Sequence, residues 1–168
     1  MGVPFAIESA DVDEVAELAD PRQVPPYNAE RKAAAVSAKH PENPVLGADT
    51  VILFGGRVIG KPRDEADALA ILTELAGKTH EVVTGLALLR RKPEFRRVWS
   101  ETTRVTFKPF DVGTAQRYLS LVHVLDKAGA YAIQEHGELL VASVDGDLDN
   151  VVGLPLENLR QALDALRG

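Results

Sequence analysis

The stretch Val45-Leu46-Gly47-Ala48-Asp49-Thr50-Val51-Ile52-Leu53-Phe54 is apolar on both sides of one polar pair, Asp49 and Thr50. Ten residues of this kind predict a strand that is buried on both faces of a sheet. Gly55-Gly56 follows directly and predicts a tight turn into a second short strand at residues 57–59. The sequence therefore predicts a β-hairpin that carries one carboxylate into the interior of the fold.

Helices and strands are predicted on both sides of this hairpin. The helices are expected from Asn28, as N-cap, to the residues before Pro41; from Asp64 through Ala76; from Asp111 to about Val122; and from Pro155 to the last leucines. The other strands are expected at Pro4 to Ile7, His80 to Leu89, Val98 to Phe107, Ala130 to Gln134 and Leu139 to Val144. We expect residues 80–89 and 98–107 to pair antiparallel across a turn at 90–97. This order fits an α+β fold or an α/β fold with a mixed sheet better than a strictly parallel one.

Composition and length exclude several classes of protein. A chain of 168 residues fits one domain, residues 1–168, with a core that needs no disulfide. Because cysteine is absent, thiolate metal sites and cysteine nucleophiles are excluded. The formal charge of -6 argues against an extended surface for a nucleic-acid polymer. Neither a secretion signal nor an apolar run of membrane-spanning length is found, so we expect a cytoplasmic protein without a membrane partner.

Asp49 is the strongest single candidate for a functional residue. A carboxylate within an apolar strand carries a desolvation cost unless a partner or a metal compensates it. A structural aspartate that is hydrogen-bonded to a loop explains the same pattern equally well. Lys61 lies in the turn after the hairpin, where the chain can return toward Asp49. Taken singly, Lys61, Lys32 and Gln134 are each more typical of a solvated surface, and Thr50 is an ordinary strand residue.

Five blocks of sequence taken together are far more specific than these single residues. In chain order they are Leu46-Gly47-Ala48-Asp49-Thr50-Val51, Gly60-Lys61-Pro62, Gly77-Lys78-Thr79-His80-Glu81-Val82-Val83-Thr84-Gly85, Leu125-Asp126-Lys127-Ala128-Gly129-Ala130-Tyr131 with Gln134, and Asn150-Val151-Val152-Gly153-Leu154-Pro155. This series resembles the Maf family of nucleoside triphosphate pyrophosphatases, whose name refers to septum formation. The resemblance extends from Val3-Pro4-Phe5 to the last helix.

The resemblance implies both a fold and a reaction. Members are similar in architecture to the inosine triphosphate pyrophosphatases, an α/β fold with a mixed β-sheet split into two lobes around a nucleotide cleft. They hydrolyse a nucleoside triphosphate to the monophosphate and pyrophosphate. By this match Asp49 is the catalytic proton acceptor, while Lys32 and Lys61 serve the phosphates. Glu14 and Asp49 are then the expected ligands of a divalent cation, Mg²⁺ or Mn²⁺, which prefers oxygen ligands.

Two further positions bear on the base that the protein accepts. Thr50 and Gln134 are similar to the branch of the family that prefers dTTP and UTP, whereas the branch acting on 7-methyl-GTP more typically has Gln and Glu there. A glutamine amide offers one donor and one acceptor to the edge of uracil or thymine. The resemblance therefore implies pyrimidine triphosphates, modified ones included, as substrates.

Two alternatives from other functional classes stay open at this point. The first is a catalytically impaired nucleotide-binding or cell-division regulatory protein, which would bind nucleotide without turnover. The second is a structural interaction domain, in which the five blocks are packing features only. A homodimer is compatible with either of them and with the enzyme.

The sequence departs from the family at its start, and this departure generates a prediction. Family members carry a strand and a loop resembling Ser-x-Ser-Pro-Arg-Arg before the segment that matches Val3-Pro4-Phe5. That loop holds phosphates through its arginines, and one such charge-assisted donor is worth roughly a hundredfold in turnover. We expect the 168-residue form to be weakly active, and an extension of family type ahead of Gly2 to raise pyrophosphate release sharply. Equal rates for the two forms would contradict this expectation.

Overall fold

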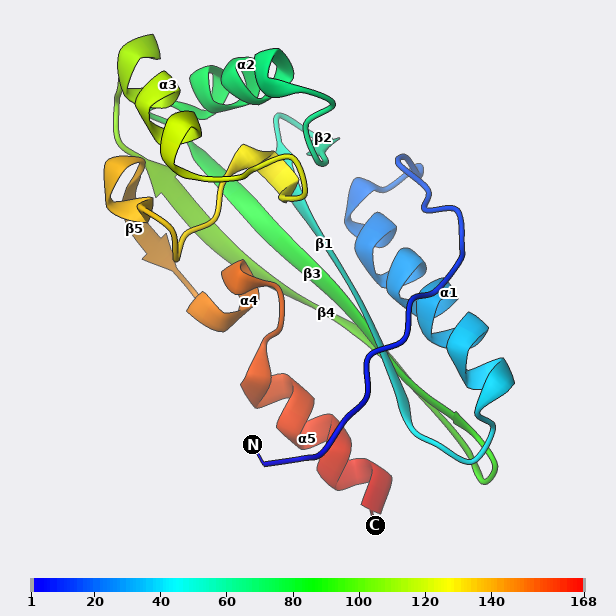
Figure 1. The fold of residues 1–168 in the computed structure, drawn as a ribbon. Helices are drawn as coiled ribbons and strands as arrows, with labels where there is room; N and C mark the ends of the chain where they lie inside the picture. Colours follow the sequence, from blue (N-terminus) through cyan, green and yellow to red (C-terminus); the bar gives the residue numbers. More distant parts are fainter. Residues whose placement is uncertain (1, 168) are drawn as a thin grey trace.

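The computed structural model describes residues 2–167 as a five-stranded sheet flanked by helices (Figure 1). The strands are β1 (Val45–Phe54), β2 (Arg57–Ile59), β3 (Thr79–Arg91), β4 (Glu94–Phe107) and β5 (Val141–Asp145). The α-helices are α1 (Val24–Lys39), α2 (Glu65–Leu75), α3 (Val112–Leu121), α4 (Leu148–Val152) and α5 (Leu156–Arg167), and short 3₁₀ turns lie at η1 (Pro21–Gln23), η2 (Ala128–Ala130) and η3 (Gly137–Leu139). No helix within this part of the chain is long and apolar enough to cross a membrane.

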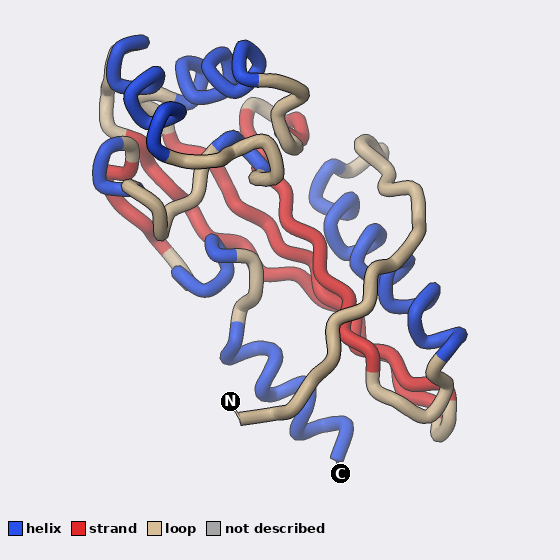
Figure 2. Tube along the Cα trace, in the orientation of Figure 1, coloured by secondary structure: helices blue, strands red, loops and turns tan. Residues whose placement is uncertain are grey.

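The sheet has the strand order β2-β1-β3-β4-β5, and each neighbouring pair is antiparallel. Figure 2 shows β1, β3 and β4 as a long twisted band with helices on either side of it. Because successive side chains of a strand point to opposite faces, β1 contributes to two different clusters. Val51 and Leu53 pack with Val24 at the start of α1, whereas Ile52 faces the helices α2 and α3. The expected α/β fold class is confirmed.

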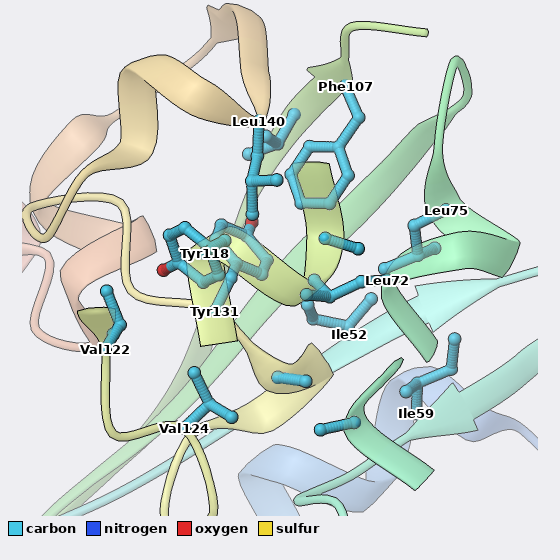
Figure 3. Packing of buried hydrophobic residues seen from close by; sticks show 14 of the residues in the cluster. Ile52, Ile59, Leu72, Leu75, Phe107, Tyr118, Val122, Val124, Tyr131 and Leu140 are labelled. Carbon is cyan, nitrogen blue, oxygen red and sulfur yellow. The ribbon is translucent and has the colours of Figure 1, made fainter. Parts of the chain in front are cut away.

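The main hydrophobic core lies between the sheet and the α2–α3 pair (Figure 3). Leu72 and Leu75 of α2 and Tyr118 of α3 are completely buried there against Ile52 and Phe107. Asp64 and Asp111 cap the two helices, each accepting a hydrogen bond from a backbone N–H three residues later. Both helices therefore begin at the aspartates from which they were predicted, and the final helix, α5, also forms where it was predicted.

Helix α1 begins five residues earlier than predicted, since its N-cap is Gln23 and not Asn28. Pro25 and Pro26, which precede the predicted N-cap, lie in the first turn of the helix, where a missing N–H costs nothing. Asn28 is consequently not an N-cap. It is a buried helical residue whose side chain is free to bond elsewhere.

The segment from Pro4 to Ile7 is not a strand, contrary to prediction. A strand needs a neighbour to take its backbone hydrogen bonds, and no strand within residues 2–167 pairs with this segment. Phe5 and Ile7 are accordingly 83% and 89% exposed. The segment is attached through Glu8, whose carboxylate contacts both the Lys39 ammonium and the His40 ring.

Residues 130–134, also predicted as a strand, form a turn of η2 followed by an irregular loop. The physical reason is the Tyr118 hydroxyl, which accepts the Ala132 N–H at 2.9 Å and donates to the Ala132 carbonyl at 3.1 Å. A side chain thus replaces the neighbouring strand as partner of this backbone. The next predicted strand, 139–144, is displaced to Val141–Asp145 because η3 occupies its first residues.

The hairpin between β3 and β4 is longer than predicted, and one helix was missed. Both strands continue through the polar residues 90–97 until Arg91 pairs with Glu94, which leaves only Lys92 and Pro93 in the turn. Polar residues can continue a strand where the sheet projects into solvent, so their polarity did not mark the turn. Helix α4 escaped prediction because its five residues are too few to show helical periodicity.

His80 on β3 is a buried titratable group within the main core. Its Nε2 atom lies 2.9 Å from the Tyr131 hydroxyl, and its ring meets Phe107 edge-on at 4.8 Å between centroids. Burial lowers the pKa of His80 from 6.5 to about 4, and burial raises the pKa of Tyr131. The imidazole is therefore neutral in the folded protein near pH 7.

This low pKa predicts a loss of stability in weak acid. Between pH 6.5 and 4 the unfolded chain binds a proton at His80 that the folded chain does not, so the free energy of unfolding falls as pH falls through this window. The shift corresponds to about 3 kcal/mol at most. Urea unfolding at a series of pH values measures it. A His80→Gln variant, which cannot titrate, should show a flatter profile, and identical slopes would contradict the assignment.

Candidate active site

A cleft of about 350 Å³ opens between β1, the turn after β2, the loop around residues 126–135 and the end of α4. Five of the residues selected from the sequence line this cleft: Lys32, Asp49, Thr50, Lys61 and Gln134. They come from α1, from β1 and from two loops, so their convergence is a property of the tertiary fold. Glu14, the sixth residue, lies beside them through its contact with Lys32.

The Asp49 carboxylate, which is only 9% exposed, is compensated by two partners on α1. The Lys32 ammonium lies 2.8 Å from Oδ1. The Asn28 amide donates to Oδ2 at 3.2 Å. An ion pair together with a hydrogen bond on the second oxygen is the arrangement that makes a buried carboxylate tolerable.

Two glycines allow α1 to come close enough to make these contacts. A Cβ atom on Gly47 of β1 would lie 2.2 Å from the Ala29 carbonyl oxygen, and one on Gly85 of β3 would lie 2.1 Å from the Pro26 nitrogen. Any side chain at either position would push the helix away from the sheet. The glycine of the Leu46–Val51 block therefore determines how near Lys32 lies to Asp49.

The Lys32 ammonium joins two carboxylates. Besides Asp49 it contacts Glu14 Oε1 at 2.8 Å. Burial alone would lower the pKa of Lys32, but the hydrogen bonds with Asp49 and Glu14 outweigh it, so the pKa is raised. The same contact lowers the pKa of Glu14. Within the cluster Glu14-Lys32-Asp49, the Lys32 ammonium and the Glu14 carboxylate are thus expected to be charged at neutral pH.

Asn28 attaches the amino-terminal segment to this cluster. Its side-chain oxygen accepts the Val15 N–H at 2.9 Å, and its Nδ2 donates to the Val15 carbonyl at 3.0 Å as well as to Asp49. Val15 follows Glu14 directly in the chain. One buried amide therefore holds both carboxylates of the cluster in place.

Two lysines, Lys61 and Lys127, lie on the facing wall of the cleft, together with the carboxylates of Asp126 and Glu135. Lys61 follows β2, and its turn is tied to η2 by a hydrogen bond of 2.9 Å from the Gly129 N–H to the Gly60 carbonyl. Within residues 2–167 no hydrogen bond or ion pair occupies the Lys61 ammonium, whereas Lys127 is 3.0 Å from the neighbouring Asp126 carboxylate. An anion that enters the cleft meets lysines from both walls.

Comparison with known proteins identifies the family. The chain matches the model for Maf-like proteins over residues 1–166. It belongs to the Maf-like family. It is 42% identical to the dTTP/UTP pyrophosphatase of Akkermansia muciniphila over 98% of this chain and 87% of that protein. It is also 44% identical to the dTTP/UTP pyrophosphatase of Symbiobacterium thermophilum over 97% of this chain and 84% of that protein. The dTTP/UTP pyrophosphatase of Myxococcus xanthus is 43% identical over 93% of this chain and 79% of that protein.

Two lining or supporting residues of the Maf-like site were not selected from the sequence. Lys127 lies in the Leu125–Tyr131 block, so its place in a family motif was a usable signal. Asn28 gave no such signal, because an asparagine near a helix start is normally a cap. Gln134 was selected, although it lies in the loop between η2 and η3 and not at the end of a strand.

The carboxylates of this Maf-like site are of the kind that binds a divalent cation, but they are too few to hold one by themselves. Glu14 and Asp49 converge on one point, which the Lys32 ammonium occupies. Within residues 2–167 no group of three or more histidine, aspartate or glutamate side chains is placed to hold a metal ion. A magnesium or manganese ion here would need further oxygens from the phosphates of a substrate.

The arrangement around Asn28 predicts the effect of removing its amide. An Asn28→Leu variant leaves Asp49 Oδ2 and the Val15 backbone without a buried partner, which costs roughly 1–3 kcal/mol in the free energy of unfolding. Urea denaturation measures this loss. Asn43→Leu is the matched control, because Asn43 is exposed and makes no side-chain hydrogen bond within residues 2–167. Equal stability of the two variants would show that Asn28 does not hold the cluster.

Proposed function

We propose that this Maf-like protein hydrolyses pyrimidine nucleoside triphosphates, dTTP and UTP foremost, to the monophosphate and pyrophosphate. The observation that carries the proposal is the placement of a buried carboxylate and lysines from two walls within one cleft of nucleotide size. The names of the relatives, at 42–44% identity, support the same reaction.

Asp49 is proposed to orient the attacking water and to accept its proton. Hydrolysis of the bond between the α and β phosphates needs a group of this kind, because water is a weak nucleophile. Its depth in the cleft and its hydrogen bond from Asn28 fix the direction of the carboxylate. Such preorganisation is effective in catalysis because the group does not have to be ordered at the moment of reaction.

Lys32 and Lys61 are proposed to neutralise the charge that develops on the leaving pyrophosphate. Lys61 is the more available of the two, since its ammonium projects into the cleft from an exposed turn. Lys32 is held by two carboxylates, so a triphosphate has to compete for it. A shift of Lys32 toward the phosphates would weaken its hold on Asp49 and make this carboxylate a better acceptor for the proton of water.

A divalent cation is proposed to be held by Glu14 and Asp49 together with oxygens of the substrate. When bound, it supplies positive charge that positions the phosphates and stabilises the leaving group. Because the Lys32 ammonium lies between these two carboxylates, the cation can bind both of them only when Lys32 shifts toward the phosphates.

Thr50 and Gln134 are proposed to contact the base. Gln134 is exposed at the mouth of the cleft, where its amide can reach a ring edge, and Thr50 lies deeper, on β1. Uracil and thymine present two carbonyl acceptors on either side of one N–H donor, and these two side chains supply both kinds of partner.

The reaction is tested by its product. We expect UTP and dTTP to release pyrophosphate, so that orthophosphate is detected only after inorganic pyrophosphatase is added, and we expect the rate to depend on Mg²⁺ or Mn²⁺. An Asp49→Asn variant should lose about two to four orders of magnitude in kcat. Asp164→Asn, an exposed aspartate on α5, is the control for loss of a carboxylate far from the cleft. Direct release of orthophosphate would contradict the proposed reaction.

The alternative of binding without turnover makes a different prediction in the same assay. A nucleotide-binding regulator would be stabilised by UTP in a thermal unfolding experiment, because a ligand that binds only the folded state raises its stability. It would release no pyrophosphate from UTP even with the metal present. The two measurements together separate the enzyme from the regulator.

A further inference from the structure

A chain of hydroxyl groups leads from the cleft into the core. Thr50 of β1 and Thr84 of β3 are direct cross-strand partners, and their hydroxyl oxygens lie 2.9 Å apart. Thr84 is completely buried and donates to the backbone carbonyl of Asn150 at 3.2 Å. Thr50 alone of the two threonines lines the cleft.

The Asn150 carbonyl ends this series of hydrogen bonds and is held in a fixed position. The Asn150 side chain, which is fully buried, donates to the Val82 carbonyl and to the Thr103 hydroxyl oxygen, each at 3.1 Å. Thr103 in turn donates to the Asp147 carbonyl at 2.8 Å. These bonds hold α4 against β3 and β4, so the carbonyl cannot turn away from Thr84.

The positions of the two hydroxyl hydrogens follow from counting donors. A carbonyl can only accept, so Thr84 uses its single hydrogen on Asn150. Thr84 then accepts from Thr50. In the opposite arrangement the Thr84 oxygen and the Asn150 carbonyl, which also accepts the Gly153 N–H at 3.0 Å, would face each other at 3.2 Å without a hydrogen between them, so that their lone pairs would repel inside a buried region.

We infer that Thr84 is a specificity-positioning residue, which forces the Thr50 hydroxyl to present only lone pairs to the cleft and so selects bases that carry an N3–H. This inference rests on the proposed function of the cleft and narrows its substrates. Uracil and thymine donate a hydrogen at N3, whereas cytosine accepts at the same ring position. Thr50 pairs with the first two and repels the third.

Gln134 cannot make this distinction. Within residues 2–167 no hydrogen bond fixes its exposed amide. Rotation of the amide exchanges its donor and acceptor, so the same side chain suits uracil or cytosine equally well. The distinction between a hydrogen-bond donor and an acceptor at N3 of the base therefore depends on the Thr50 hydroxyl, which Thr84 holds in place.

The test measures affinity for α,β-methylene analogues of UTP and CTP, which cannot be cleaved at the scissile bridge. The result is thus independent of turnover, and a failure of pyrophosphate release leaves it valid. By calorimetric titration in Mg²⁺ we expect the 168-residue protein to bind the UTP analogue about tenfold more tightly than the CTP analogue, because a mismatched partner leaves a buried acceptor unpaired.

A Thr84→Val variant keeps the shape of the side chain but releases the Thr50 hydroxyl, which can then donate to cytosine. We expect the affinity for the CTP analogue to rise and the preference to fall to within about threefold. Thr84→Ser, which keeps the hydroxyl, should restore the preference. Two results would overturn the inference: equal affinities of the unchanged protein for the UTP and CTP analogues, or an equal loss of affinity for both analogues in Thr84→Val.

A second variant keeps the test decisive if Thr84→Val does not fold, which thermal unfolding will show. Thr50→Val removes the acceptor at the surface of the cleft without touching the core. It should weaken the UTP analogue by about tenfold and, because it also removes the repulsion of the cytosine N3, bind the CTP analogue at least as tightly as the unchanged protein does. An unaltered preference in Thr50→Val would likewise overturn the inference.

Discussion

The buried carboxylate of Asp49 is the constraint on which the rest of the site depends. A charge that is 9% exposed has to be matched, and both groups that match it belong to α1. Helix α1 can supply them because Gly47 and Gly85 remove the side chains that would separate helix from sheet. The packing of α1 on the sheet therefore fixes both the position of Lys32 and the direction of the Asp49 carboxylate.

The same helix also organises the amino-terminal segment. This segment has no regular structure, yet Asn28 binds Val15 on both its N–H and its carbonyl, and Lys39 and His40 hold Glu8. The first of these attachments places Glu14 beside Lys32. A segment that makes few core contacts is thereby tied to the cleft beside the Lys32 ammonium.

The two faces of β1 have different physical characters. On the α1 side of β1, charges are paired and buried, and this is the side that suits water and phosphate. On the opposite face of the strand, neutral hydroxyls run from Thr50 through Thr84 to the carbonyl of Asn150. Alternation along a single strand thus separates the residue proposed for hydrolysis, Asp49, from the residue proposed to recognise the base, Thr50.

The sequence by itself determined the elements whose signals are local. Strand β1, its hairpin with β2, the capped helices α2 and α3 and the amphipathic α5 follow from apolar pattern, turn glycines and capping aspartates. The order of five motif blocks also pointed to the family and to the residues that line the cleft.

What only the tertiary structure decided depends on partners distant in the chain. Residues 130–134 are not a strand, and the Tyr118 hydroxyl bonds both backbone groups of Ala132 in their middle. Residues 4–7 are not a strand because no strand within residues 2–167 lies beside them. Asn28 supports the site and does not cap the helix for the same reason. Its hydrogen-bond partners, the Val15 N–H, the Val15 carbonyl and Asp49, come within reach only when α1 packs on the sheet.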